Sequence, residues 1–123
     1  MLASGENLKQ VFANAAKGMF SLITDLRKVK TTYRKEINIT APDKESLLVA
    51  WLNELIYTFD VEQLLFKKFD IIKLTDNLLR AIAWGEKVDS NRHPIKLGIK
   101  STTYHMLEIK KNQGYHAKIF FDI

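Results

Sequence analysis

Residues 31–59 read TTYRKEINITAPDKESLLVAWLNELIYTF and change from one hydrophobic period to another at a central turn, Ala41-Pro42-Asp43. Before this turn apolar and polar side chains alternate, which predicts a half-exposed strand over 31–40. After it apolar residues recur every three or four positions as far as Phe59, and Asp43 is placed to cap an amphipathic helix. A strand followed directly by a helix indicates a domain that contains both kinds of element.

The rest of the chain adds one more helix and several strands. Apolar residues from Leu8 to Leu26 follow a helical period, with Asn7 as the expected N-cap and an end between Asp25 and Lys28. Alternating segments after Asp60, broken by turns and a polar loop over 87–94, predict strands over 65–74, 78–86, 95–110 and 115–123. We therefore expect a single domain over 1–123 in which two amphipathic helices pack on a mostly antiparallel sheet.

Composition narrows the function. The chain of 123 residues has no cysteine, which excludes disulfides, thiol catalysis and thiolate metal sites. No apolar run approaches the roughly 18 to 20 residues of a membrane span, so we expect a soluble cytoplasmic protein that does not act on membranes. A net charge of +5 favours an anionic partner such as RNA, a nucleotide-bearing protein or an acidic protein surface. No nucleophile elbow, phosphate loop or dinucleotide fingerprint is present, and we expect no enzymatic activity.

The last hairpin allows its strand register to be predicted. If 112–114 is a hairpin loop with Gly114 in the left-handed conformation, Lys111 faces Tyr115, and the apolar residues of both strands share one face. An unbroken pleat then places Tyr104 opposite Asp122, and His105 opposite Phe121 on the core side. Lys96, Lys100 and Lys110 would share the face of Asp122.

The chain ends on two carboxylates, the Asp122 side chain and the Ile123 terminus. Hard oxygen ligands of this kind suit calcium or magnesium. The alternative is an aspartate that ends a strand beside a free terminus, because calcium normally takes six or more oxygens. Lys100 is either part of a solvated lysine row or a cation that holds the carboxylates or binds a phosphate on a partner.

Four motifs in their order along the chain resemble the archease family. They are Leu47-Leu-Val-Ala-Trp-Leu-Asn-Glu-Leu55, Gly85-Glu86 with Asp89 and His93-Pro94, Ile99-Lys-Ser-Thr-Thr-Tyr-His105, and Phe121-Asp122-Ile123. The resemblance covers nearly the whole chain. It implies a small α+β protein that assists the RtcB-type RNA ligase, the enzyme that joins tRNA halves after intron removal, by promoting guanylylation of the ligase histidine. The implied role is non-catalytic activation in tRNA splicing.

The resemblance also implies roles for individual residues. Archeases bind a divalent cation, recorded as calcium, through an N-terminal aspartate, the penultimate aspartate and the C-terminal residue, and Asp122 and Ile123 match the last two. Lys100 matches a lysine implicated in ligase activation. Glu86, Asp89 and His93 fall in a family loop whose role is structural or partner-facing, and Tyr104 is a further candidate for partner contact.

One departure from the family pattern lies at the start. Archeases open with a strand that carries His-Thr-Ala-Asp, and Leu2–Gly5 resembles only the tail of that strand. With one anionic ligand fewer, we expect weak or absent cation binding by this form, and an exposed sheet edge. The alternative function, drawn from the basic charge, is a general RNA-binding or chaperone-like module that acts on RNA-processing proteins.

Overall fold

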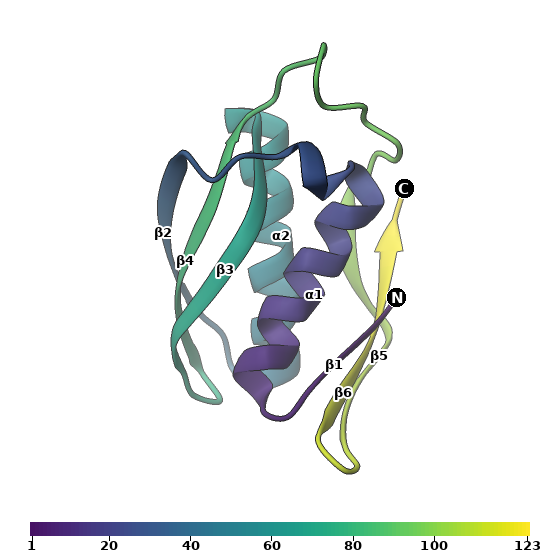
Figure 1. The fold of residues 1–123 in the computed structure, drawn as a ribbon. Coiled ribbons are helices and arrows are strands. Elements are labelled where there is room, and N and C mark those ends of the chain that lie inside the picture. The colour runs from purple at the N-terminus through teal and green to yellow at the C-terminus, as the bar shows by residue number, and fades with distance from the viewer.

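The computed structural model describes all residues, 1–123, and places two helices between two three-stranded sheets (Figure 1). The strand orders are β2-β4-β3 and β1-β6-β5, and every neighbouring pair is antiparallel. The elements are β1 (Leu2–Gly5), α1 (Leu8–Ile23), the 3-10 helix η1 (Leu26–Lys28), β2 (Tyr33–Thr40), α2 (Lys44–Glu62), β3 (Leu64–Leu74), β4 (Leu78–Lys87), β5 (Ser101–Lys111) and β6 (Tyr115–Asp122). The predicted α+β class and antiparallel pairing are confirmed, but the strands form two sheets instead of one.

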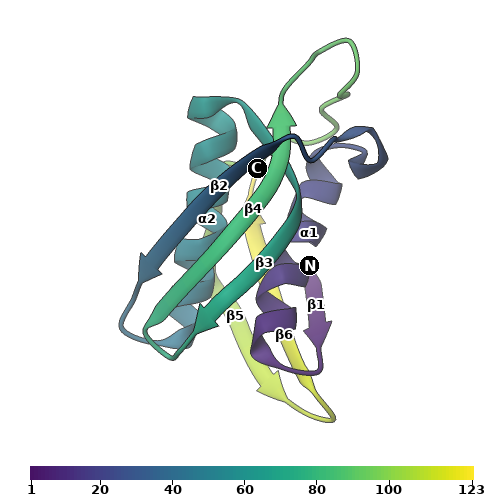
Figure 2. The same ribbon diagram turned by 60° about the vertical axis from the view of Figure 1, so that its left-hand side comes forward.

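The division into two sheets arises in the segment 88–100, which leads from β4 to β5 without forming a strand (Figure 2). The prediction of a strand from Ile95 onward is therefore wrong over 95–100. Here the Lys96 N–H donates to the Ile23 carbonyl at 2.7 Å, and the Thr24 hydroxyl donates to the Pro94 carbonyl at 2.8 Å. The segment satisfies backbone groups against the end of α1, which directs β5 to the other side of the helices.

Both helices begin where their capping residues predict. The Asn7 side chain accepts from the Gln10 N–H at 2.9 Å, and Asp43 accepts from the Ser46 N–H at 2.7 Å. No helix in the structure combines the length and the hydrophobicity that crossing a membrane requires.

The core lies between the helices and the inner faces of both sheets. The Trp51 indole N–H donates to the Phe12 carbonyl at 3.0 Å and joins α2 to α1 in the buried interior. Phe20 packs edge-on against Phe66 with ring centroids 5.9 Å apart, and Trp51 packs edge-on against Phe69 at 6.0 Å. Aromatic pairs of this geometry each add about 0.5–1.5 kcal/mol beyond their burial.

The final hairpin follows the predicted register only near its turn. Gly114 has φ +104, and the pairs Lys111↔Tyr115 and Glu108↔Lys118 are those expected. A large bulge then places residues 104–107 between the pairs Glu108↔Lys118 and Thr103↔Phe120, with Met106 at φ +55.

The bulge overturns three predicted positions. Ser101, not Tyr104, lies opposite Asp122. His105 is exposed instead of facing the core, and its ring packs on Phe120 at a centroid distance of 6.3 Å. The broken pleat also removes the basis for placing Lys96, Lys100 and Lys110 on one face with Asp122.

Strand β1 pairs with β6 and makes β6 the central strand of its sheet. The Met1 amino group donates to the Ile119 carbonyl at 2.8 Å, and the Ile119 N–H donates to the Met1 carbonyl at 2.9 Å. From Phe120 to Asp122, β6 pairs with β5 alone.

Candidate functional site

The end of β6 brings together three residues that the family motif singles out. Asp122 ends the strand and Ile123 follows it, and both are exposed. The Lys100 N–H donates to the Asp122 carbonyl at 2.7 Å, and the Ser101 hydroxyl donates to the Asp122 carboxylate at 3.2 Å. The backbone of Lys100 is therefore bonded to that of Asp122 at the start of β5, and the predicted placement of the Lys100 ammonium beside the carboxylates stays a prediction.

A residue of α2 fixes this start of β5. Asn53 accepts from the Thr102 N–H at 2.6 Å and donates to the Thr102 carbonyl at 3.4 Å, so one side-chain amide holds both backbone groups of a residue that is only 4% exposed. We did not single out Asn53 from the sequence. The available signal was a polar residue between the buried Leu52 and Leu55 of an apolar stripe.

The oxygen ligands at the end of β6 are of the type that a hard cation prefers, but they are too few. Calcium takes six to eight oxygens, whereas the groups gathered here are the Asp122 carboxylate, the Ile123 terminus and the Ser101 hydroxyl. No group of three or more histidine, cysteine or acidic side chains in the structure could hold a metal ion. The residues present therefore supply only part of a coordination sphere.

The second motif cluster, around Glu86 and His93, lies inside the molecule. Glu86 is 8% exposed and His93 is 1% exposed. The His93 Nδ1 lies 2.9 Å from the Asp89 N–H, which must donate, so the ring carries its proton on Nε2. That proton is shared between the Lys28 carbonyl and the Glu86 carboxylate, each 3.1 Å away. His93 therefore joins the Asp89 backbone, the Lys28 carbonyl and Glu86.

Glu86 is the acceptor at the centre of this cluster. It accepts from the Arg92 guanidinium, from the Lys30 N–H at 2.6 Å and from His93. Hydrogen bonding by Arg92 above all, assisted by the bonds from Lys30 and His93 and opposed by burial, lowers the pKa of Glu86 from 4.5 to about 2. The ionised carboxylate ties β4 to the loop after it and to the segment after η1.

These contacts support the structural one of the two roles expected for the loop residues. Glu86 and His93 are nearly buried and bind groups of their own chain, and a contact of either residue with a partner stays a prediction. Asp89 is partly exposed, and it accepts from Asn91 N–H at 3.0 Å and from Arg92 Nε at 3.4 Å. Tyr104 is 62% exposed and retains an accessible side chain.

Comparisons with known proteins cover almost the whole chain. A model of the Archease protein family (MTH1598/TM1083) matches residues 1–123. The chain belongs to the archease family. It is 41% identical over 127 residues to a protein archease of Methanosarcina mazei, covering 99% of this chain and 87% of that one. A protein archease of Sulfurisphaera tokodaii is 38% identical, covering 96% and 86%.

Two solved structures show the archease fold. The solution structure of Methanobacterium thermoautotrophicum protein 1598 matches with a TM-score of 0.80 and 35% identity, over 98% of this chain and 87% of that one. The crystal structure of a Thermotoga maritima archease, described as a possible chaperone, matches with a TM-score of 0.69 over 100% and 88% of the two chains. At 17% identity that second likeness concerns the fold alone.

Proposed function

We propose that this chain is a non-catalytic activator of an RtcB-type tRNA-splicing RNA ligase and promotes guanylylation of the ligase. Membership of the archease family supports the proposal, and so does the end of β6, where Lys100, Asp122 and Ile123 are exposed together. These charges face outward, as residues that act on another protein's site must. The buried Glu86 and His93 hold the loop that precedes Lys100.

The proposed contributions of the exposed residues are binding and orientation. The Lys100 ammonium is a compact positive charge that can approach a phosphate of the ligase-bound nucleotide. The carboxylates of Asp122 and Ile123 can approach cationic groups around the same nucleotide. A calcium or other divalent ion would be held weakly, because these two carboxylates and the Ser101 hydroxyl supply fewer oxygens than calcium takes.

A guanylylation assay tests the activation. The chain is mixed with an RtcB-type ligase and radiolabelled GTP, and covalent ligase–GMP is followed over time. We expect faster formation with the wild-type chain, a loss of most of the acceleration with Lys100→Ala, and full acceleration with Lys111→Ala, which removes an equal charge from the hairpin tip. If the wild-type chain gives no acceleration, the proposal fails.

A chaperone-like action on an RNA-processing protein is the second candidate, favoured by one observation. The bulge in β5 leaves Tyr104 and Met106 62% and 57% exposed, and exposed apolar side chains can hold a partly unfolded protein. This action would reduce aggregation of a heated ligase without GTP and would depend on Tyr104 and Met106 but not on Lys100. Activation of guanylylation would show the opposite dependence.

A further inference from the structure

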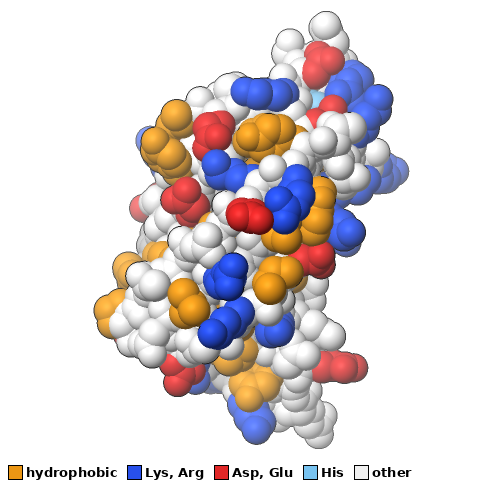
Figure 3. All heavy atoms as spheres, turned by 90° about the vertical axis from the view of Figure 1, so that its left-hand side faces the viewer, with side chains coloured by type: hydrophobic (Ala, Val, Ile, Leu, Met, Phe, Trp, Pro, Cys, Tyr) orange, Lys and Arg blue, Asp and Glu red, His pale blue; other side chains and the backbone are white.

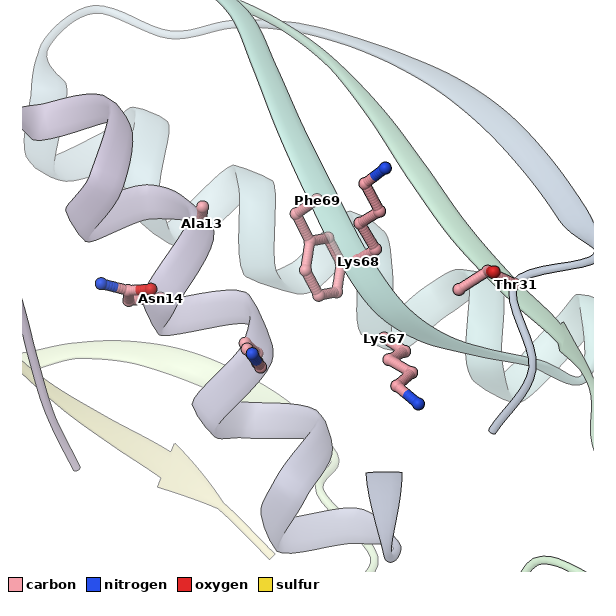
Figure 4. A pocket seen from close by; sticks show the side chains of 7 residues that line it. Ala13, Asn14, Thr31, Lys67, Lys68 and Phe69 are labelled. Atoms are coloured by element: carbon pink, nitrogen blue, oxygen red, sulfur yellow. The ribbon is translucent and has the colours of Figure 1, made fainter. Parts of the chain in front are cut away.

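A hollow lined by lysines lies between α1 and β3, with a volume of about 360 Å³. Asn14 lies on the α1 side, while Lys67 and Lys68 come from β3 and Thr31 from the segment before β2 (Figure 4). Lys17 of α1 also lines the hollow. We call it the α1–β3 hollow.

A second hollow of about 420 Å³ lies beside η1. It is lined by the side chains of Arg27, Lys28, Lys30, Asn91 and Arg92, and we call it the η1 hollow. Neither lining includes an aspartate or a glutamate. Lys30 of one hollow and Thr31 of the other are consecutive, so the two hollows lie on either side of one short segment, and we call their cations together the basic track.

The track is built into the backbone at Lys67. A bulge in β3 leaves Lys67 as the extra residue between the pairs Phe66↔Gly85 and Lys68↔Trp84. Gly85 is required there, since a β-carbon would lie 1.7 Å from a carbonyl oxygen of β3. The bulge thus turns an additional lysine toward the helices.

The bulged lysine is then fixed in the hollow. Lys67 Nζ donates to the Val29 carbonyl at 3.2 Å, which places its ammonium at the segment that joins the two hollows. Lys68 continues the track onto the outer face of the β2-β4-β3 sheet, where its Nζ lies 4.6 Å from the centroid of Trp84. Lysine and arginine side chains lie among apolar and acidic ones over this face (Figure 3).

The charges of the track are of two kinds. The arginines are oriented by buried or neighbouring carboxylates, Arg27 by Asp25 at 2.9 Å and Arg92 by Glu86. Lys17, Lys28 and Lys30 form no ion pair in the structure and are exposed. Their positive charge is therefore free for an anionic ligand.

We propose that this basic track binds the phosphodiester backbone of RNA without regard to sequence. An isolated phosphate could occupy only one hollow, whereas regularly spaced phosphates can reach the cations of both. Thr31 and Asn91 add side chains that can hydrogen-bond phosphate oxygens and ribose 2′-hydroxyls. The Lys68 ammonium lies over the Trp84 ring, and if it turned to a phosphate it would leave the ring for a base, a feature that fits RNA better than an acidic peptide.

The track is separate from the exposed end of β6, and its binding requires no ligase. A chain that accelerates guanylylation but binds no RNA would refute this proposal and leave the proposed function intact. A chain that binds RNA but gives no acceleration would refute the proposed function and leave this proposal intact.

Fluorescence anisotropy of a labelled oligouridylate of about 20 nucleotides tests the proposal with the full chain. The test variant, Lys17→Gln/Lys30→Gln, removes one free charge from each hollow. The control, Lys73→Gln/Lys111→Gln, removes the same charge from exposed positions on β3 and β5 near the hairpins at the opposite end (Figure 1). Circular dichroism establishes that both variants are folded.

We expect the test variant to bind about tenfold more weakly at low salt, and the control to bind like the wild type. The slope of log K against log salt between about 50 and 200 mM should become shallower by about 1.4 in the test variant, or about 0.7 for each lost phosphate contact. Equal weakening by both variants would mean a response to total charge and would overturn the proposal. So would undetectable binding at low salt, or equal competition by a polyglutamate peptide, which would assign the track to acidic proteins.

Discussion

The clusters around Glu86 and Asp122, which lie in two different archease motifs, differ in the number of hydrogen bonds that their carboxylates accept. Around Glu86 the carboxylate accepts from Arg92, the Lys30 N–H and His93, and the cluster lies between β4, the following loop and the segment after η1. Around Asp122 a single hydroxyl reaches the carboxylate, and the rest of its surroundings is solvent. Motif residues of one family therefore differ in their surroundings: Glu86 holds a loop, whereas Asp122 keeps its carboxylate accessible at the surface.

The largest test of this contrast removes the central carboxylate. Glu86→Ala leaves the Lys30 N–H without its acceptor and removes one acceptor from Arg92 and one from His93, which keep Asp89 and the Lys28 carbonyl. Because Glu86 is nearly buried but the Arg92 side chain is 40% exposed, we expect the free energy of unfolding by urea to fall by about 2–3 kcal/mol. Glu36→Ala removes an exposed carboxylate paired with Arg34 at 3.0 Å and should cost less than about 1 kcal/mol. Similar losses for both variants would contradict a buried network.

The dependence of the free energy of unfolding on pH should reveal the same cluster. The pKa of Glu86 falls from 4.5 to about 2 on folding, so its contribution is complete above about pH 4.5 and is lost as the pH falls toward 2. A shift of this size corresponds to about 3 kcal/mol as an upper value. Glu86→Gln should therefore be less stable than the wild type at pH 6, with a gap that narrows steadily toward pH 2. Unfolding by urea across this pH range measures the gap, and a constant gap would refute the linkage.

The local parts of the fold could be predicted, and the parts that depend on distant segments could not. Asn7 and Asp43 cap their helices through bonds to residues three positions on, and the pair Glu108↔Lys118 follows from one hairpin loop. The bulge over 104–107 has no turn signal such as glycine or proline, since its left-handed residue is Met106. Register prediction therefore failed at the point where it had to place Tyr104.

In the candidate site, too, contacts between sequence neighbours could be predicted, whereas contacts between distant residues could not. Asp122 and Ile123 are neighbours in sequence, so their grouping required no knowledge of the fold. The cluster around Glu86 depends on the Lys30 N–H, which donates to Glu86, and on the Lys28 carbonyl, which accepts from His93. Both lie more than fifty positions before Glu86 along the chain and are brought to the cluster only by folding. Asn53 likewise acts on Thr102, 49 positions later. Hydrophobic periodicity carries no information on such polar pairs.

A smaller effect should come from the link between α2 and the exposed end. Asn53→Ala leaves the N–H and carbonyl of Thr102 without their partner, which should cost about 1–2 kcal/mol in unfolding by urea. Because Asn53 fixes the start of β5, activation of the ligase should also fall although Lys100 is unchanged. Glu54→Ala, on the same helix, is the control and should preserve activation. If Asn53→Ala loses stability but retains full activation, Asn53 does not position Lys100.

The smallest expected effect concerns calcium at Asp122 and Ile123. Two carboxylates and a hydroxyl fall short of the six or more oxygens that calcium takes, so we expect a Kd of about 1 mM or weaker by isothermal titration. At a calcium concentration of about 1 mM such binding adds only about 0.4 kcal/mol to the free energy of unfolding. Asp122→Asn should abolish this increment and leave stability without calcium unchanged, because the carboxylate is exposed. A micromolar Kd would mean that further ligands complete the site, and the exposed end would then resemble the Glu86 cluster in having its polar groups satisfied within the chain.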